Sequence, residues 1–298
     1  MKNVKSGEVI FVPGNANIDL TGTYATVIPG GVTLAGDRGS DGSLGGRIFR
    51  NRVANENEYA KIPTFVIGGD NVRITGLRIQ GQDTIQDQLF EDVGSEVKSA
   101  IKATGRSGLE VDNCELWGWS HAAVMLENCK LSFVHHNYIH HCQARGYGYG
   151  VALEGGTALI EANKFDYTRH AIMGEGLPTE GYEARYNIHL GHGEAIGGHH
   201  FDVHGYSYNG GTIAGTSYKI HHNTFLASKL PALGIRGKPI TGVYVNNNIF
   251  TSSWMNEGVL RVGFQRNDGH GAYLNVFMTN NMISGVAEAT SRLAKEDI

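Results

Sequence analysis

A short pattern of apolar and polar positions recurs along the chain. Two apolar or extended residues are followed by two polar residues, an Asn and another apolar residue. The clear copies occupy residues 133–139, 159–165, 219–225, 244–250 and 277–283. Weaker copies have Leu77, Cys114 and Asn187 at the Asn position. Each copy alternates with period 2 and is rich in β-branched and aromatic residues, so the pattern predicts short strands and excludes helical repeats.

The spacing of these copies predicts how the strands stack. The Asn positions fall at 77, 114, 137, 163, 187, 223, 248 and 281, with shorter steps of 23 to 26 residues and longer ones of 33 to 37. A shorter step fits one turn of a coil with three short strands, and a longer step adds an inserted loop. The sequence therefore predicts an all-β, single-domain right-handed parallel β-helix over residues 1–298, with Asn-marked rungs and loop insertions. The rivals are a β-sandwich and a β-propeller, which would need units of roughly 40 residues with four strands each.

The marked turns and the two ends of such a coil carry further expectations. A buried Asn at a tight turn can bind backbone groups, so stacked Asn residues should form a ladder. An open last rung exposes a sheet edge and needs a cover. Residues 1–60 are interpreted as N-terminal capping rungs, and the polar segment 286–298 is interpreted as a C-terminal cap.

Composition narrows the range of ligands and locations. The 42 glycines suit a fold with many tight turns, and the net charge of −4 gives no basic field for nucleic acid. Three cysteines without metal-site spacing (Cys114, Cys129 and Cys142) are expected to be buried thiols. No segment reaches the ~20 apolar residues of a membrane span. The start lacks an apolar signal segment. We expect a secreted or extracellular protein whose signal is absent from this sequence, with a cytoplasmic location as the alternative.

A second column of strands precedes the marked turns and carries the candidate chemistry. In each triplet of this column, such as 124–126 or 201–203, the outer two residues should face the core, and the middle and following residues should face outward. The strand around position 201 then presents His200, Asp202, His204 and Tyr206 on one face. Adjacent rungs, ~4.8 Å away, add Arg169, His170, Glu175, Arg236 and Arg261. Three titratable groups on one strand face indicate a functional site.

These residues suit removal of the proton next to the carboxylate of a uronic acid. The step needs a cation near that carboxylate, a base for the C5 proton and an acid for the departing oxygen. Arg236 is assigned to the carboxylate and His204 to the base, with Asp202 orienting it and Tyr206 as the acid. His200 completes the catalytic row, and the residues assigned to substrate binding are Arg169, His170, Glu175 and Arg261.

The predicted function is therefore β-elimination on an acidic polysaccharide or oligosaccharide, with no required cofactor. Returning the proton to the opposite face of C5 would instead give C5-epimerisation with the same residues. Because the side chains should face solvent, replacing His204 or Arg236 with Ala is expected to lower activity and leave the fold intact.

The Asn-marked rungs and the Asp202-Val203-His204 segment resemble pectate-lyase-type β-helices, and within them mannuronan C5-epimerases and alginate lyases. Those epimerases carry a Tyr-Gly-x-Asp-Pro-His signature, in which His and Tyr act on the C5 proton and Asp assists. The resemblance implies these roles for Asp202 and His204. The proline is replaced by Val203, and His199 stands where the tyrosine should be. Tyr206 as the acid is therefore our own assignment and not part of the resemblance.

Three alternatives use the same scaffold. Gly191-His192-Gly193 resembles the Gly-His-Gly motif of polygalacturonase-type hydrolases, but hydrolysis needs paired carboxylic acids, and only Asp202 and Glu175 lie on nearby rungs. A divalent metal, calcium or a transition metal, is the second alternative, with His200, Asp202 and His204 as ligands. The third is a non-enzymatic, sugar-binding or structural β-helix, in which Trp117 and Trp119 would serve as aromatic platforms or simply pack under loops.

Overall fold

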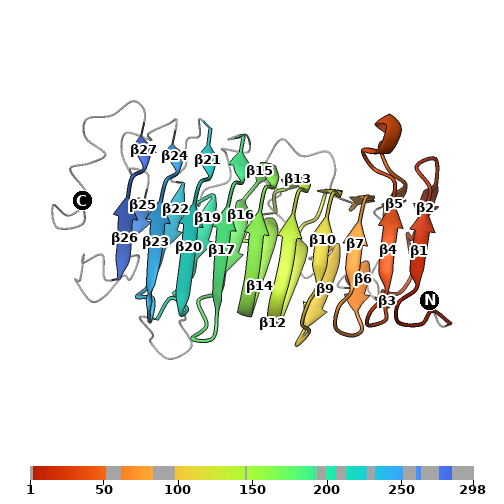
Figure 1. Ribbon diagram of the computed structural model, residues 1–298, viewed down its shortest axis with the longest axis horizontal. Helices are drawn as coiled ribbons and strands as arrows, with labels where there is room; N and C mark the ends of the chain where they lie inside the picture. Colours follow the sequence, from red (N-terminus) through yellow and green to blue (C-terminus); the bar gives the residue numbers. More distant parts are fainter. Residues whose placement is uncertain are drawn as a thin grey trace.

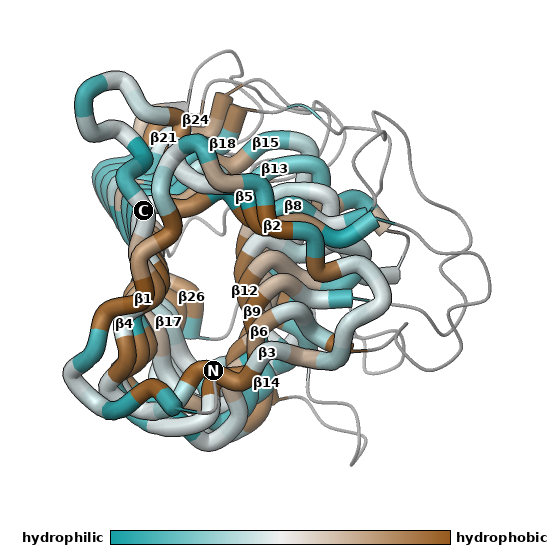
Figure 2. The backbone as a smooth tube through the Cα atoms, turned by 90° about the vertical axis from the view of Figure 1, so that its right-hand side faces the viewer, coloured by the Kyte–Doolittle hydropathy of each residue, from teal (hydrophilic) through white to brown (hydrophobic). Residues whose placement is uncertain are grey.

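The computed structural model describes residues 3–51, 62–82, 98–144, 146–190, 192, 199–205, 213–226, 232–250, 260–262 and 275–283. Over these residues the chain winds into a coil of parallel strands whose turns stack along one axis, from the N-terminal end to the C-terminal end (Figure 1). Viewed along that axis, the coil has three sides (Figure 2), which we call faces A, B and C. Within the described part of the chain, no helix is long and apolar enough to cross a membrane.

Faces A and B belong to one hydrogen-bonded sheet, because the long strands β12 (Ala122–His135) and β14 (Tyr149–Glu161) bend from one face to the other. The remaining strands of face A are β3 (Thr26–Ile28), β6 (Phe65–Ile67), β9 (Ile101–Thr104), β16 (His170–Gly174), β19 (Phe201–Val203), β22 (Leu233–Ile235) and β25 (Leu260–Val262). Those of face B are β1 (Val9–Val12), β4 (Thr33–Gly36), β7 (Arg73–Thr75), β10 (Glu110–Asp112), β17 (Gly181–Arg185), β20 (Ser217–His221), β23 (Gly242–Asn246) and β26 (Val276–Thr279).

Face C is a separate sheet of short strands that closes the coil. Its strands are β2 (Asn17–Asp19), β5 (Arg47–Phe49), β8 (Arg78–Gln80), β11 (Glu115–Trp117), β13 (Tyr138–Cys142), β15 (Lys164–Thr168), β18 (Ile188–His189), β21 (Thr224–Phe225), β24 (Ile249–Phe250) and β27 (Met282–Ile283). A 3₁₀ turn, η1 (Ser40–Gly42), lies in the loop before β5. Every pairing between the described strands is parallel and joins a strand to its equivalent one turn away, as the sequence predicted.

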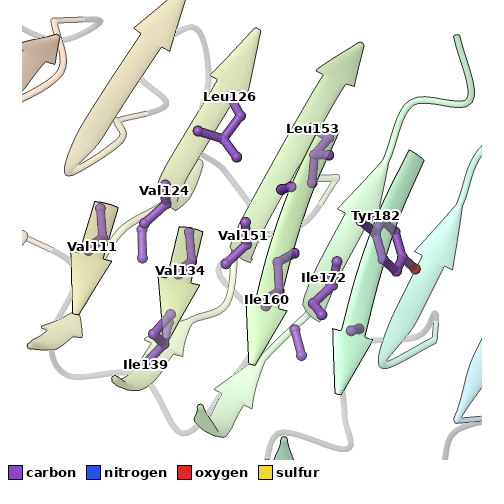
Figure 3. Close-up of a cluster of buried hydrophobic side chains, with 14 of the residues drawn as sticks. Val111, Val124, Leu126, Val134, Ile139, Val151, Leu153, Ile160, Ile172 and Tyr182 are labelled. Atoms are coloured by element: carbon purple, nitrogen blue, oxygen red, sulfur yellow. The ribbon is translucent and has the colours of Figure 1, made fainter. Parts of the chain in front are cut away.

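The interior is filled by one apolar side chain after another from all three faces. Figure 3 shows part of this column, with Val124 and Val151 of face A near Val134 and Ile160 of face B. These side chains are fully buried. Because the side-chain period of a strand is two, the positions between them point away from the interior and are available for surface chemistry.

The predicted Asn ladder is present at the turn between faces B and C. Each amide side chain accepts hydrogen bonds from the backbone N–H and the Nδ2 of the Asn one turn earlier, at 2.9–3.0 Å. The ladder runs through Asn137, Asn163, Asn187, Asn223, Asn248 and Asn281. Cys114 occupies the same position one turn earlier, and its backbone N–H donates to Asn137. All three cysteines are buried thiols, as predicted.

The two segments interpreted as caps have different outcomes. Within residues 1–60, the described part already forms strands β1 to β5, and β1 pairs in register with β4 in the same way as later rungs. Segment 286–298 lies outside the described residues.

Candidate active site on the outer side of face A

Strand β19 places one carboxylate on the outer side of face A. Phe201 and Val203 point into the core, and Asp202 between them points outward. In the register of the sheet, Asp202 lies between Met173 and Gly234 of the neighbouring rungs. Gly234 leaves room for an imidazole at this point, because a Cβ there would lie only 2.3 Å from the His199 ring.

His200 does not lie on this outer row, which corrects the sequence prediction. Its side chain is buried, and its ring packs against that of His189 with a centroid distance of 3.6 Å. His189 is in register with Phe165 and Phe225, so this pair belongs to the interior. Burial lowers the pKa of His200 to about 3, and the ring is therefore neutral.

The physical reason is a break in the strict alternation just before each triplet of face A. In the preceding rungs, consecutive residues such as Ala123 and Val124, or Ala171 and Ile172, both face the core. His200 occupies the position equivalent to Ala171 on the next rung, and its carbonyl accepts a hydrogen bond of 2.7 Å from the backbone N–H of Ala171. The residue one place earlier, His199, takes the outward position instead.

Four side chains converge on Asp202, which has no exposed surface. Arg236 donates to both carboxylate oxygens, with Nε at 3.1 Å from Oδ1 and Nη2 on Oδ2. Three imidazoles approach the same carboxylate. Nε2 of His204 lies 2.8 Å from Oδ2, Nε2 of His170 lies 3.3 Å from Oδ2, and Nδ1 of His199 lies 3.3 Å from Oδ1. The predicted solvent exposure of this residue is therefore wrong, since its partners cover it completely.

His204 sits between two carboxylates. Its Nε2 faces Asp202, and its Nδ1 lies 3.2 Å from Oε2 of Glu175 on the neighbouring rung. The side chains of His204 and Glu175 are partly exposed, so this pair forms the accessible edge of the cluster. Burial lowers the pKa of His204, but the two carboxylates outweigh this effect and the net pKa lies above its usual value. For Asp202, burial raises the pKa, and the facing cationic and imidazole groups more than offset it, so the carboxylate is ionised.

The column that contains Glu175 and His204 holds more acids than the sequence analysis recognised. The residue that follows each triplet points outward, and along the coil these residues are Glu127, Glu154, Glu175, His204 and Arg236. Burial and the charges of Glu127 and Glu175 raise the pKa of Glu154. The rule that the residue after the triplet faces outward was sufficient to find Glu127 and Glu154.

A ring stack borders the cluster where face C turns into face A. The rings of Tyr149 and His170 are stacked at 5.7 Å, and those of His170 and His199 at 6.1 Å. Nδ1 of His170 contacts the backbone carbonyl of His199, which fixes the ring in place. Burial lowers the pKa of His170 to about 3. Arg169 is half-buried at this edge, next to Tyr149 and His170.

The other predicted site residues have separate outcomes. The structure brings His170, Glu175, His204 and Arg236 to Asp202, as expected. The predicted acid Tyr206 lies outside the described residues. Gly234 lies one rung beyond Asp202, and Arg261 is in register with Gly234 on the rung after that. Only the backbone position of Arg261 is described.

The residues behind two alternatives lie on other parts of the surface. His192, from the Gly-His-Gly segment, contacts the buried Asp166 of face C at 2.8 Å, and its two glycines lie outside the described residues. Trp119 is buried and donates to the carbonyl of Ile79, whereas Trp117 stacks on His140. A cavity of about 430 Å³ opens on face B beside Glu180, and the cations at its rim, Arg185 and Lys219, both pair with Glu183. None of these residues contributes to the Asp202 cluster.

A comparison with models of known protein families shows the family of this chain. The family model described as the right-handed β-helix region matches residues 9–182, more than half of the chain. The chain belongs to this right-handed β-helix family. No curated protein matches it.

Two solved structures are similar to this chain, and the first of them shows the same fold. One is an alginate lyase from Paenibacillus sp. str. FPU-7, with a TM-score of 0.62 and 11% identity, over 96% of this chain and 91% of that one. The other is the tailspike protein of E. coli bacteriophage HK620 in complex with a pentasaccharide, with a TM-score of 0.43 and 14% identity, over 93% of this chain and 60% of that one. At these identities the likeness concerns the fold alone.

Proposed function

We propose that this β-helix is a carbohydrate-active enzyme that cleaves an acidic polysaccharide by β-elimination at the Asp202 cluster. The observation that carries the proposal is the arrangement of His204 between Asp202 and Glu175, with Arg236 on the same carboxylate. Elimination next to the carboxylate of a uronic acid requires a cation, a base and an acid in one place. All three kinds of group meet here at the surface of face A.

The pair of His204 and Glu175 supplies the proton transfers. At 3.2 Å, an imidazole nitrogen and a carboxylate oxygen hold one proton between them, which can leave for the departing 4-oxygen of the sugar. As it leaves, Nδ1 of His204 accepts the C5 proton, the electrons of the C5–H bond form the C4–C5 double bond, and the bond from C4 to the departing oxygen breaks. Asp202, at 2.8 Å from Nε2, stabilises the imidazolium that forms. Glu175 was assigned to substrate binding from the sequence, and its contact with His204 gives it this additional role in our proposal.

Arg236 contributes the positive charge. Its Nε and Nη2 are directed at Asp202, so Nη1 is the group that a substrate carboxylate would accept from. Arg169 lies at the other border of the cluster and is a second cation for a polyanionic chain. The same groups would serve a C5-epimerase if the proton returned to the opposite face of the sugar, and the product distinguishes the two reactions.

Glycoside hydrolysis is a second candidate, favoured by the Glu127, Glu154 and Glu175 column. Two carboxylates whose environments separate their pKa values can act as acid and base across a glycosidic bond. The raised pKa of Glu154 would suit the acid. In this case Asp202 would have no direct part, since Arg236 and the imidazoles occupy it.

One assay separates these reactions. The protein is incubated with alginate, pectate and glycosaminoglycans, and the products are followed by ultraviolet absorbance, by reducing ends and by the C5 configuration in NMR spectra. Elimination gives new reducing ends with the absorbance of an unsaturated uronate, and hydrolysis gives reducing ends without it. Epimerisation changes the C5 signals with neither. A protein that binds these polymers but changes none of them would contradict the proposed enzymatic function.

A further inference from the structure

Besides the acid–base pair of His204 and Glu175, the cluster around Asp202 contains a second group of side chains with ligand atoms close together. His170, His199 and Asp202 each offer one ligand atom, and these atoms all lie within 4.8 Å of one another. All three side chains are at least nine-tenths buried. His204, which carries the proposed proton transfers, is not one of the three.

The distances match those between ligands of a metal ion. Nε2 of His170 and Nδ1 of His199 each lie 3.3 Å from an oxygen of Asp202. Metal–ligand bonds of about 2.0–2.1 Å in tetrahedral geometry place neighbouring ligand atoms about 3.3 Å apart. Charge-assisted hydrogen bonds between nitrogen and carboxylate are shorter, at about 2.7–2.9 Å. Neither nitrogen makes a hydrogen bond of normal geometry to any described residue.

The tautomer of His170 also supports a cation between this ring and Asp202. Its Nδ1 contacts the backbone carbonyl of His199 closely, whereas the amide nitrogen of His199 is 3.4 Å away. A carbonyl oxygen only accepts, so Nδ1 carries the proton and Nε2 presents a lone pair to the carboxylate of Asp202. Two acceptors facing each other in a buried site need a cation between them. A carbonyl behind a histidine ring is also the usual outer partner of a metal-bound imidazole.

We infer that His170, His199 and Asp202 form a binding site for a first-row divalent cation of the Zn²⁺ type. Two imidazoles and one carboxylate suit Zn²⁺ or Co²⁺, whereas Ca²⁺ prefers oxygen ligands alone. Asp202 retains acceptor capacity for the ion, because a carboxylate has about four lone-pair sites, of which the Arg236 fork takes two and His204 one. Of the predicted metal set only Asp202 remains, because His200 faces the core and His204 is not one of the three, and His170 and His199 take their places. This inference is independent of the proposed elimination.

The chain also offers a matched control. Glu110, Asp112 and His135 on face B bring three ligand atoms equally close together. That cluster is partly exposed, and Arg73 pairs with both of its carboxylates, at 3.4 and 2.9 Å. His135 contacts Glu110 and His136, so its nitrogens have partners without an ion. It is therefore a histidine–carboxylate cluster of the same composition class whose charges are already satisfied.

The test measures metal binding without substrate. Full-length protein is stripped with chelator, titrated with Zn²⁺ by calorimetry and, separately, with Co²⁺ while the visible absorption is followed. We expect one equivalent of Zn²⁺, and intense Co²⁺ bands of a four-coordinate nitrogen and oxygen site that Zn²⁺ abolishes. His170→Gln and His199→Gln should weaken binding by about 100-fold or more, whereas His135→Gln should bind as the wild type does. Circular dichroism verifies folding, and the Co²⁺ spectrum of the wild type decides the matter if a variant fails to fold.

Two results would overturn the inference. One is a wild-type protein that binds no Zn²⁺; His170 as an imidazolium in its NMR spectra would then show that the cation between the two acceptors is a proton. The other is Zn²⁺ binding that His170→Gln and His199→Gln leave unchanged. Neither result bears on the polysaccharide assay, whose readout is product formation.

Discussion

Asp202 combines an outward position with complete burial, and this combination determines what its neighbours do. A carboxylate without solvent stays ionised only if neighbouring groups stabilise its charge, and otherwise takes up a proton. The Arg236 fork together with His204 keeps Asp202 charged. The charge in turn holds His204 beside Glu175 at the accessible edge. Function in the proposed mechanism therefore rests on His204 and on the partly exposed Arg236, while the buried Asp202 holds both in place.

Replacing His204 with Gln should lower kcat about 100-fold, the usual scale for an acid–base residue. The partly exposed ring can be lost without opening the core, so the thermal unfolding midpoint should change little. Glu154→Gln, one rung before Glu175 in the same column, is the matched comparison. Elimination predicts a large loss for His204→Gln and a small one for Glu154→Gln, and the reverse order would favour hydrolysis.

Arg236→Ala has a different expected outcome from the one drawn from sequence, where the fold was expected to remain intact. The substitution removes the only guanidinium on a fully buried carboxylate among the described residues, and breaking a buried pair from one side costs about 3–5 kcal/mol of unfolding free energy. Denaturant titration measures this loss. Pairing it with Asp202→Asn should recover part of the stability but none of the activity; full additivity of the two changes would contradict the coupling.

The residues of the site were predictable only where the alternation of the strand is regular. Asp202, His204 and Arg236 follow the rule of inward and outward positions, and the structure places them together. His200 breaks the rule because two consecutive residues face the core at that point of every central rung. The small residues Ala123, Gly150 and Ala171 at the equivalent positions are the sequence signal of this break, and reading them as a column would have exchanged His200 for His199.

At the scale of the element, the recurring unit is a turn closed by an amide. The Asn side chain accepts from the Asn one turn earlier and donates through Nδ2 to a carbonyl of the face B strand one turn earlier, as Asn248 does to Ile220. Buried backbone groups at the turn are satisfied in this way without water. The repeat was visible in the sequence because this requirement is the same in every rung, whereas the inserted loops have no common requirement and differ in length.

Asn248→Ala should therefore destabilise the fold by about 2–3 kcal/mol, since it removes several buried hydrogen bonds and leaves the N–H of Asn223 without its acceptor. Asn246→Ala, two residues earlier, is the control, because Asn246 is partly exposed and, within the described part of the chain, its side chain accepts a hydrogen bond from its exposed neighbour Asn247. Its effect should stay within about 0.5 kcal/mol. Equal losses of unfolding free energy in the two variants would show that the ladder contributes little.

At the scale of the whole molecule, the three faces form one continuous stack, so a charge buried at any corner acts on the stability of the stack. Glu180 is such a charge, at the corner between faces A and B. It accepts from the backbone N–H groups of Gly155 and Gly176 and from the hydroxyl of Tyr218. Tyr182 also faces it from within the core. Burial outweighs the three hydrogen bonds and raises the pKa of Glu180 to about 7.

The raised pKa makes the stability of the whole coil depend on pH. Because the folded chain binds this proton more tightly than the unfolded chain, the free energy of unfolding should fall as pH rises from about 4.5 to about 7. The slope from this one group is at most about 1.4 kcal/mol per pH unit. Glu180→Gln should remove that contribution and flatten the profile measured by denaturant titration at each pH. Glu183→Gln is the control, since its pairing with His221, Arg185 and Lys219 outweighs burial and lowers the pKa of Glu183, so its contribution changes below this window. A profile equally steep in wild type and Glu180→Gln would mean that Glu180 is already ionised in the folded coil, held by its three donors.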